Sequence, residues 1–229
     1  MAILQLTLAN CRDEIRRRIG ERTGGTTISN PNVSDAELTR QINLYLQRLP
    51  RRTAQLTESP REIKFDMWRT FSDLTETAGS STVYLPVDYD RFISFWDQTN
   101  GSKLWVVKDV EKYYRKRKHL DRADTDRTGP PEAIEILDFA SNSGTWQRRG
   151  LLHPNTASGV TPDIRMYYWR LPATVSSDSD TLDLDIKYQD VAIYGPLLEF
   201  YRDDDPAYER YEALEREILI GLAKTAKVI

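Results

Sequence analysis

The chain has little of the chemistry from which metal and catalytic sites are usually built. Its 229 residues include one cysteine, Cys11, and two histidines, His119 and His153. A single cysteine cannot form an internal disulfide, and neither histidine stands in an HExxH, CxxC or similar spacing. We therefore expect no zinc site, and we expect Cys11 to be a buried thiol on an apolar helix face, which fits a reducing cytoplasm.

Common catalytic motifs are also missing. The sequence contains no GxSxG, Walker A or GxGxxG pattern, so the usual nucleophile elbow and phosphate-binding loops are absent. Asp178, Ser179 and Asp180 begin like a calcium loop, but Leu182 occupies the next alternate position and the glycine is absent. Carboxylates are plentiful, although one sequence cannot show which pair would meet in a cleft. These observations predict a protein that is not an enzyme and needs no cofactor.

Long apolar runs and a strong charge of one sign are lacking as well. No stretch of eighteen apolar residues occurs, and arginines interrupt the first twenty residues, so we expect neither a membrane span nor a signal peptide. The formal net charge of −3 gives no general attraction to nucleic acid or to an anionic membrane. Charged residues make up 29% of the chain and lie in local blocks of both signs, which favours specific protein contacts.

What is present is a succession of patterned segments. An apolar stripe predicts a helix over 4–20, and a capping box at Ser34 and Glu37 begins a second helix that Pro50 closes. A β-rich middle follows, in which Asn100-Gly101 predicts a hairpin and 109–120 a helix that carries a basic run. The strands are expected at 63–67, 82–85, 91–96, 103–107, 133–137, 145–152 and 164–171.

The last part of the chain predicts a helical hairpin. Pro172 ends the final strand, an acidic loop covers 176–185, and apolar residues then recur every three or four positions from Tyr188. Asp205 is the expected cap of a second helix that begins at Pro206. We predict an α+β fold with helical segments at 1–56 and 176–229 that form one helical body, and a β-rich domain with an antiparallel sheet or sandwich at 57–175.

The order of these elements resembles the head-to-tail adaptor (connector) proteins of tailed bacteriophages. The matching segments are the capped helix SDAELTRQINLYLQRL at 34–49, VYLPVDYDRFISF at 83–95, RMYYWRLPATV at 165–175, and YQDVAIYGPLLEFYRDDDPAYERYEALEREI at 188–218. The resemblance covers almost the whole chain and rests on the order and spacing of these segments. The basic segment YYRKRKH at 113–119 has no counterpart in the family pattern.

The resemblance implies a structural virion protein at the head–tail interface, made and assembled in the host cytoplasm. Such a protein forms a twelve-fold ring below the portal, extends the DNA channel without sequence-specific DNA binding, and attaches a distal tail or neck protein. The family also makes the extreme C-terminus the candidate for portal docking; here it consists of Ala226, Lys227, Val228 and Ile229.

The basic segment has two interpretations. Aromatic and basic side chains together can bind phosphates and stack on bases, but a single block in an acidic chain favours a salt-bridge surface between subunits. We expect its four cations to contact the acidic loop of a neighbouring copy. The residues concerned are Arg115, Lys116, Arg117 and Lys118 on one side and Asp178, Asp180, Asp183 and Asp185 on the other.

Two alternatives to the adaptor remain. A tail-terminator or neck protein would lie lower in the tail and would not bind the portal directly. A nucleic-acid-binding accessory protein acting through residues 115–118 would show DNA affinity that falls steeply with salt.

Overall fold

The chain folds as two compact units. The computed structural model describes residues 5–22, 33–56, 63–74, 80–108, 128–201 and 205–228. Unit 1 combines Met1–Trp68 with Leu171–Ile229, and unit 2 is Arg69–Arg170. The β-rich segment expected at 57–175 is therefore wider than unit 2 at both of its ends.

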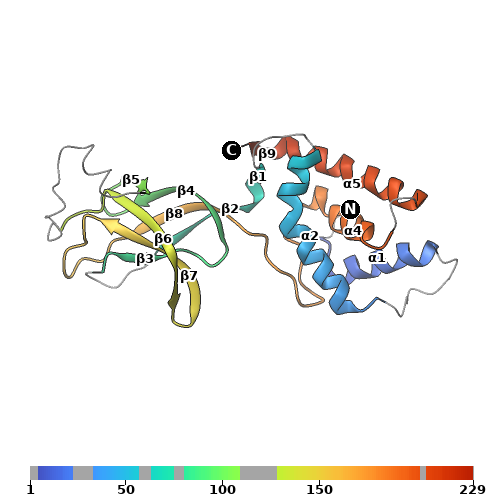
Figure 1. Cartoon of the computed structure of the whole chain (residues 1–229), viewed down its shortest axis with the longest axis horizontal. Coiled ribbons are helices and arrows are strands. Elements are labelled where there is room, and N and C mark those ends of the chain that lie inside the picture. Colours follow the sequence, from blue (N-terminus) through green and yellow to red (C-terminus); the bar gives the residue numbers. More distant parts are fainter. Residues whose placement is uncertain are drawn as a thin grey trace. The chain divides into compact units, whose positions relative to one another are not determined.

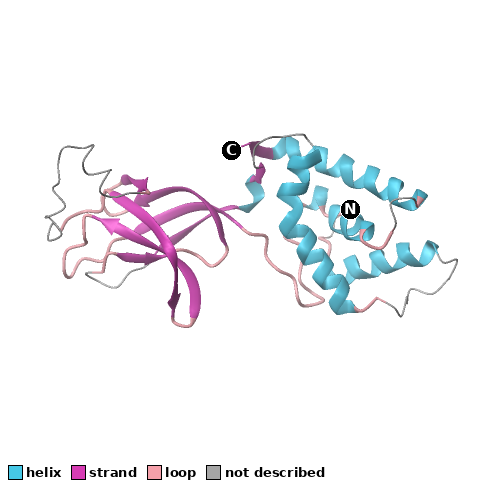
Figure 2. Ribbon diagram, viewed as in Figure 1, coloured by secondary structure: helices cyan, strands magenta, loops and turns pink. Residues whose placement is uncertain are grey.

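Unit 1 is built from helices of both ends of the chain (Figures 1 and 2). The N-terminal and C-terminal helices share one apolar core, which confirms the predicted helical body and, together with the sheet of unit 2, the α+β fold. The helices are α1 (Leu8–Arg22), α2 (Asp35–Leu56), α4 (Val191–Leu198) and α5 (Pro206–Thr225), with the short 3-10 turns η1 (Asp66–Trp68) and η2 (Ile186–Tyr188).

Two of the predicted helix starts are confirmed by their caps. The amide of Glu37 donates a hydrogen bond to the Ser34 hydroxyl at 3.2 Å, while the Glu37 carboxylate binds Arg40 at 2.8 Å. At the start of α5, the Asp205 carboxylate accepts a hydrogen bond from the amide of Ala207 at 2.9 Å. Each cap satisfies a backbone donor that the first turn of a helix leaves without a partner.

The prediction that Pro50 closes the second helix is wrong. Helix α2 continues to Leu56, although Pro50 has no N–H to donate to the preceding turn. Leu49 and Thr53 on either side are fully buried, and the Thr53 hydroxyl donates to the Leu49 carbonyl at 2.8 Å. Burial of this face outweighs the local preference of proline, so the helix passes through it.

Helix α4 lies in the middle of the helical core. Six of its eight residues are buried, so the helix has no broad polar face. The buried residues are Val191, Ala192, Ile193, Gly195, Pro196 and Leu197. Cys11 of α1 packs against α4, fully buried as expected, and its thiol donates to the Ala192 carbonyl at 3.4 Å. Burial raises the pKa of Cys11 to about 12, so the thiol stays protonated at neutral pH.

A small two-stranded sheet closes unit 1. Strand β1 (Ile63–Phe65) pairs antiparallel with β9 (Ala226–Val228), the C-terminal strand. The prediction that 63–67 belongs to the central sheet is therefore wrong, because its partner comes from the far end of the chain. Periodicity shows that a segment is extended, but it carries no information about a partner more than 160 residues away.

Unit 2 is one curled, seven-stranded sheet (Figure 2). The strand order is β2-β8-β4-β5-β6-β7-β3, and every neighbouring pair is antiparallel except β5 and β6. Its inner face packs around buried residues such as Phe95, Leu104 and Met166. The strands are β2 (Arg69–Leu74), β3 (Thr82–Tyr84), β4 (Tyr89–Asp97), β5 (Ser102–Val107), β6 (Ala133–Asn142), β7 (Thr145–His153) and β8 (Ile164–Arg170).

The sequence located most of this sheet. The hairpin at Asn100-Gly101 joins β4 to β5, and Gly101 has the positive φ of 62° that such a turn requires. Strand β2 was not predicted, although it pairs with β8 along its whole length. The helix predicted at 109–120 lies outside the described residues.

Three helices of unit 1 meet at the side chain of Tyr45 in α2. A Cβ atom at Gly195 of α4 would lie only 2.0 Å from the Tyr45 ring, so the ring occupies the space left by the missing side chain. The Tyr45 hydroxyl donates to Glu215 of α5 at 2.6 Å. Glu215 has no exposed surface, and Arg52 of α2 compensates its charge at 3.0 Å. We call Tyr45, Arg52, Gly195 and Glu215 the helix junction.

The helix junction predicts that Gly195→Ala destabilises the protein by about 3 kcal/mol, since overpacking against a ring held on both sides has no low-energy relief. This loss should outweigh the gain of about 1 kcal/mol that alanine brings inside a helix. Urea unfolding followed by far-ultraviolet circular dichroism measures the difference.

Gly221→Ala is the matched control in α5. There the new Cβ meets the edge of the Tyr188 ring at 3.2 Å, which a small movement can relieve, so the change in stability should be small. Equal destabilisation by the two substitutions would show that the junction is not tightly packed.

Candidate interaction surfaces

The acidic loop at 176–185 is organised by its own carboxylates. The Asp180 carboxylate accepts hydrogen bonds from the amides of Ser176 and Ser177, both at 2.8 Å. Asp185 caps the turn η2 by accepting from the amide of Lys187 at 3.1 Å. The sequence identified the loop as acidic but did not show that these charges hold its backbone.

The other two predicted acidic residues connect the loop to the rest of unit 1. Asp178 forms an ion pair and hydrogen bond with Arg12 of α1. The Asp183 carboxylate accepts from the amide of Ala173 at 2.8 Å, and its carbonyl accepts from the Trp68 indole at 2.9 Å. The structure thus brings all four acidic site residues into one loop with a defined conformation.

Their expected partners, Arg115, Lys116, Arg117 and Lys118, lie outside the described residues, as does His119. The contact between this basic segment and the acidic loop of a neighbour therefore stays a prediction.

Three of the four C-terminal candidate residues pair with another strand of unit 1. Ala226, Lys227 and Val228 form β9, in register with Phe65, Lys64 and Ile63 of β1, and Ile229 lies outside the described residues. The expected docking segment is thus a short paired strand that directly follows α5.

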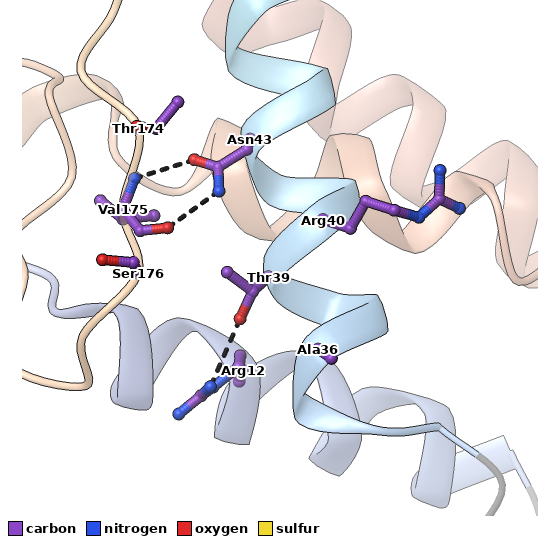
Figure 3. A pocket seen from close by; sticks show the side chains of 8 residues that line it. All are labelled: Arg12, Ala36, Thr39, Arg40, Asn43, Thr174, Val175 and Ser176. Atoms are coloured by element: carbon purple, nitrogen blue, oxygen red, sulfur yellow. Dashed lines mark hydrogen bonds between the residues drawn. The ribbon is translucent and has the colours of Figure 1, made fainter.

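An open pocket of about 590 Å³ lies between α2 and the segment before the acidic loop (Figure 3). Asn43 closes one side, because its amide both donates to and accepts from the backbone of Val175, each at 2.9 Å. Arg12 donates to Thr39 at 3.3 Å on the other side. The lining residues are Arg12, Ala36, Thr39, Arg40, Asn43, Thr174, Val175 and Ser176.

Three polar side chains that line this pocket, those of Arg12, Arg40 and Asn43, bind other residues of unit 1. The Asn43 amide binds the Val175 backbone, and the Arg40 guanidinium binds Glu37 at 2.8 Å. Arg12 is nine-tenths buried and carries its charge between Asp178 and Asp35, whose carboxylate lies 3.9 Å from Nε. Arg12 was not predicted as a connecting residue; its position directly after Cys11, on the border of the apolar stripe, was the available signal.

The described residues contain no group of three or more histidine, cysteine or acidic side chains that could hold a metal ion. His153 of β7 lies 3.8 Å from Glu135, and burial lowers its pKa, which favours the neutral imidazole. No helix within the described parts of the chain is both long and apolar enough to cross a membrane.

The acidic loop gives a testable prediction at Asp180. Hydrogen bonds from the amides of Ser176 and Ser177 lower the pKa of this carboxyl, so its stabilising effect is present above the unfolded-state pKa of about 3.9 and is lost as the pH falls through the folded-state value. At pH 7, Asp180→Asn should therefore reduce the hydrogen-exchange protection of the Ser176 and Ser177 amides several-fold.

Thr181→Ala provides a control in the same loop, because the exposed Thr181 side chain takes no part in this pair of hydrogen bonds. Unchanged protection in Asp180→Asn would mean that the carboxylate does not hold the loop.

Comparison with known proteins adds the identity of the family. A search of curated proteins finds no match to this chain. The model of the SU10 adaptor protein family matches residues 6–227, which include the described helices of unit 1 and the whole of unit 2. This is a family of phage adaptor proteins, structural rather than catalytic. The match covers nearly the whole chain, and the protein therefore belongs to the SU10 adaptor protein family.

Proposed function

We propose that this protein is a head-to-tail adaptor that forms a twelve-fold ring below the portal of a tailed phage, extends the DNA channel and attaches a distal tail or neck protein. The observation that carries the proposal is the family match over residues 6–227. The order of helices, sheet and helices agrees with the resemblance found in the sequence. The protein would be made and assembled in the host cytoplasm and would reside in the virion at the head–tail interface.

The physical properties of the chain support this role. A ring of identical subunits is built from head-to-tail contacts, in which each copy presents two different surfaces to its two neighbours. The helical unit and the sheet unit have separate cores and can supply such surfaces. The net charge of −3 also suits a channel wall, since a strongly basic wall would bind the phosphates of passing DNA.

The C-terminal residues Ala226, Lys227, Val228 and Ile229 are the proposed portal-docking segment. Pairing of β9 with β1 gives residues 226–228 a defined backbone conformation before docking. A preformed strand loses less conformational entropy on binding than a flexible peptide does, which favours docking.

The first test is the mass of the purified protein, alone and mixed with its portal. We expect a complex that contains about twelve copies of the chain, because closed heterologous rings have a fixed copy number. A protein that ignores the portal would overturn the adaptor role. It would then favour a tail-terminator or neck protein, or, if DNA binding falls steeply with salt, a nucleic-acid-binding accessory protein.

Truncation after Thr225 tests the docking segment. Because α5 ends at Thr225, the shortened chain should keep its helical content and lose binding to the portal. Circular dichroism and co-sedimentation with the portal measure the two properties separately.

Ile220→Ser is the control, since Ile220 is 42% exposed in α5 and lies outside the proposed docking segment. If the chain truncated after Thr225 is folded and still binds the portal, docking must use another segment.

A further inference from the structure

One face of the unit 2 sheet carries aromatic side chains where a polar surface is expected. The inner face of β4, β5 and β8 is packed with buried residues such as Phe95, Leu104 and Met166. When one face of an antiparallel sheet packs on a core, the other face normally bears polar residues. Here the outer side of β2, β8, β4 and β5 instead presents an aromatic face, which consists of Phe71, Trp96, Trp105 and Tyr167.

The register of the strands makes the aromatic face continuous. Phe71 lies opposite Tyr167, with 6.0 Å between ring centroids. On the next strand, β4, Ser94 is paired with Tyr167. The Trp96 indole donates to the Ser94 hydroxyl at 3.1 Å, so the Trp96 ring lies next to the residue opposite Tyr167. Trp105 stands two residues beyond Lys103, the partner of Trp96, and so shares this side of the sheet.

Three of these side chains are open to solvent, and Tyr167 is half-buried. Phe71 is 52% exposed, Trp105 is 59% exposed and Trp96 is 36% exposed. Contiguous exposed aromatic side chains are typical of protein interfaces, where tryptophan and tyrosine supply much of the binding energy.

Basic side chains lie on the same side of the sheet as the aromatic face. Arg165 stacks on the Phe71 ring at 4.5 Å and binds Asp73 through two hydrogen bonds of 2.6 and 3.0 Å, so these two charges offset each other. The exposed residues Arg69 and Lys103 add positive charge on the same side. A partner that fits this face therefore combines apolar side chains with carboxylates.

The acidic loop of unit 1 and the residues near its two ends together have this composition. Residues 176–185 contain four aspartates and no lysine or arginine. Leu171, five residues before the loop, and Ile186, directly after it, are both 42% exposed, and Asp183 joins the loop to the preceding segment by accepting from the amide of Ala173. Asp185 is exposed directly beside Ile186.

We propose that the aromatic face of one copy binds the acidic loop of a second copy. The contact is heterologous, because one copy contributes its sheet unit and the other its helical unit, and such a contact can repeat around a ring. This inference rests on the proposed ring and names the surfaces that join its subunits.

Isotope-coded cross-linking tests the contact on the full-length chain. A carbodiimide would join Lys103 to Asp178 or Asp185 in an equimolar mixture of ¹⁴N and ¹⁵N protein. We expect peptide pairs that combine a light and a heavy chain. Peptide pairs formed only within one isotope would show that the contact lies within a single chain. Links from the loop to Lys116 or Lys118 would identify the basic segment as the partner of the loop. Either result would overturn the proposal, and so would the absence of links at Lys103.

Substitutions give an independent measurement. Trp105→Ser and Phe71→Ser should each weaken self-association by about tenfold or more, as expected for aromatic residues at the centre of an interface. Thermal unfolding should change little, because both side chains are exposed. Trp146→Ser is the matched control: Trp146 is 69% exposed in the β6–β7 hairpin, opposite Ser141 and outside the aromatic face. Equal association of all three variants would contradict the proposal.

A charge exchange tests the pairing itself. Lys103→Glu should weaken association, and the added substitution Asp185→Lys should restore it, because the two charges are then opposite again. If Lys103→Glu forms rings with wild-type affinity on the portal, the aromatic face is not the subunit contact although the adaptor role stands. If the wild-type protein forms no ring at all, the proposed function fails instead.

Discussion

The helical unit depends on the contact of Tyr45 with two other helices. Its ring fills the space beside Gly195 in α4, and its hydroxyl donates to the buried carboxylate of Glu215 in α5. Arg52 supplies the opposite charge, without which burial of Glu215 would be strongly unfavourable. Burial and the charge of Glu215 raise the pKa of Tyr45, so its hydroxyl remains a hydrogen-bond donor. One side chain thereby fixes the packing of α2 against α4 and α5.

This junction explains why unit 1 uses both ends of the chain. Helix α2 precedes the sheet unit in the sequence, whereas α4 and α5 follow it, and the β1–β9 pair joins the same two parts. Residues 69–170 can then fold around a core of their own. Among the described residues, every exposed phenylalanine and tryptophan belongs to unit 2, while the acidic loop belongs to unit 1. Each copy thus has two chemically different surfaces, which a closed ring of identical subunits requires.

The sequence predicted those features that depend on neighbouring residues. Ser34, the Asp205-Pro206 pair and Asn100-Gly101 each act through backbone groups a few positions away, and all three are confirmed. Pro50 was misjudged because the buried face of α2 is stabilised by distant parts of the chain. The candidate site was predicted only in part: the acidic loop was located, but the bonds of Asp180 to the loop backbone and of Asp178 to Arg12 were not.

The sequence by itself determined the α+β class and the order of most helices and strands, because periodicity, caps and turn residues act over short distances along the chain, and its resemblance to phage adaptors indicated the family. Only the tertiary structure decided that β9 pairs with β1, that Tyr45 lies against Gly195, and that Phe71, Tyr167, Trp96 and Trp105 share one face of a sheet. Those arrangements depend on strand register and side-chain packing between segments far apart in the sequence, where local patterns contain no information about the partner.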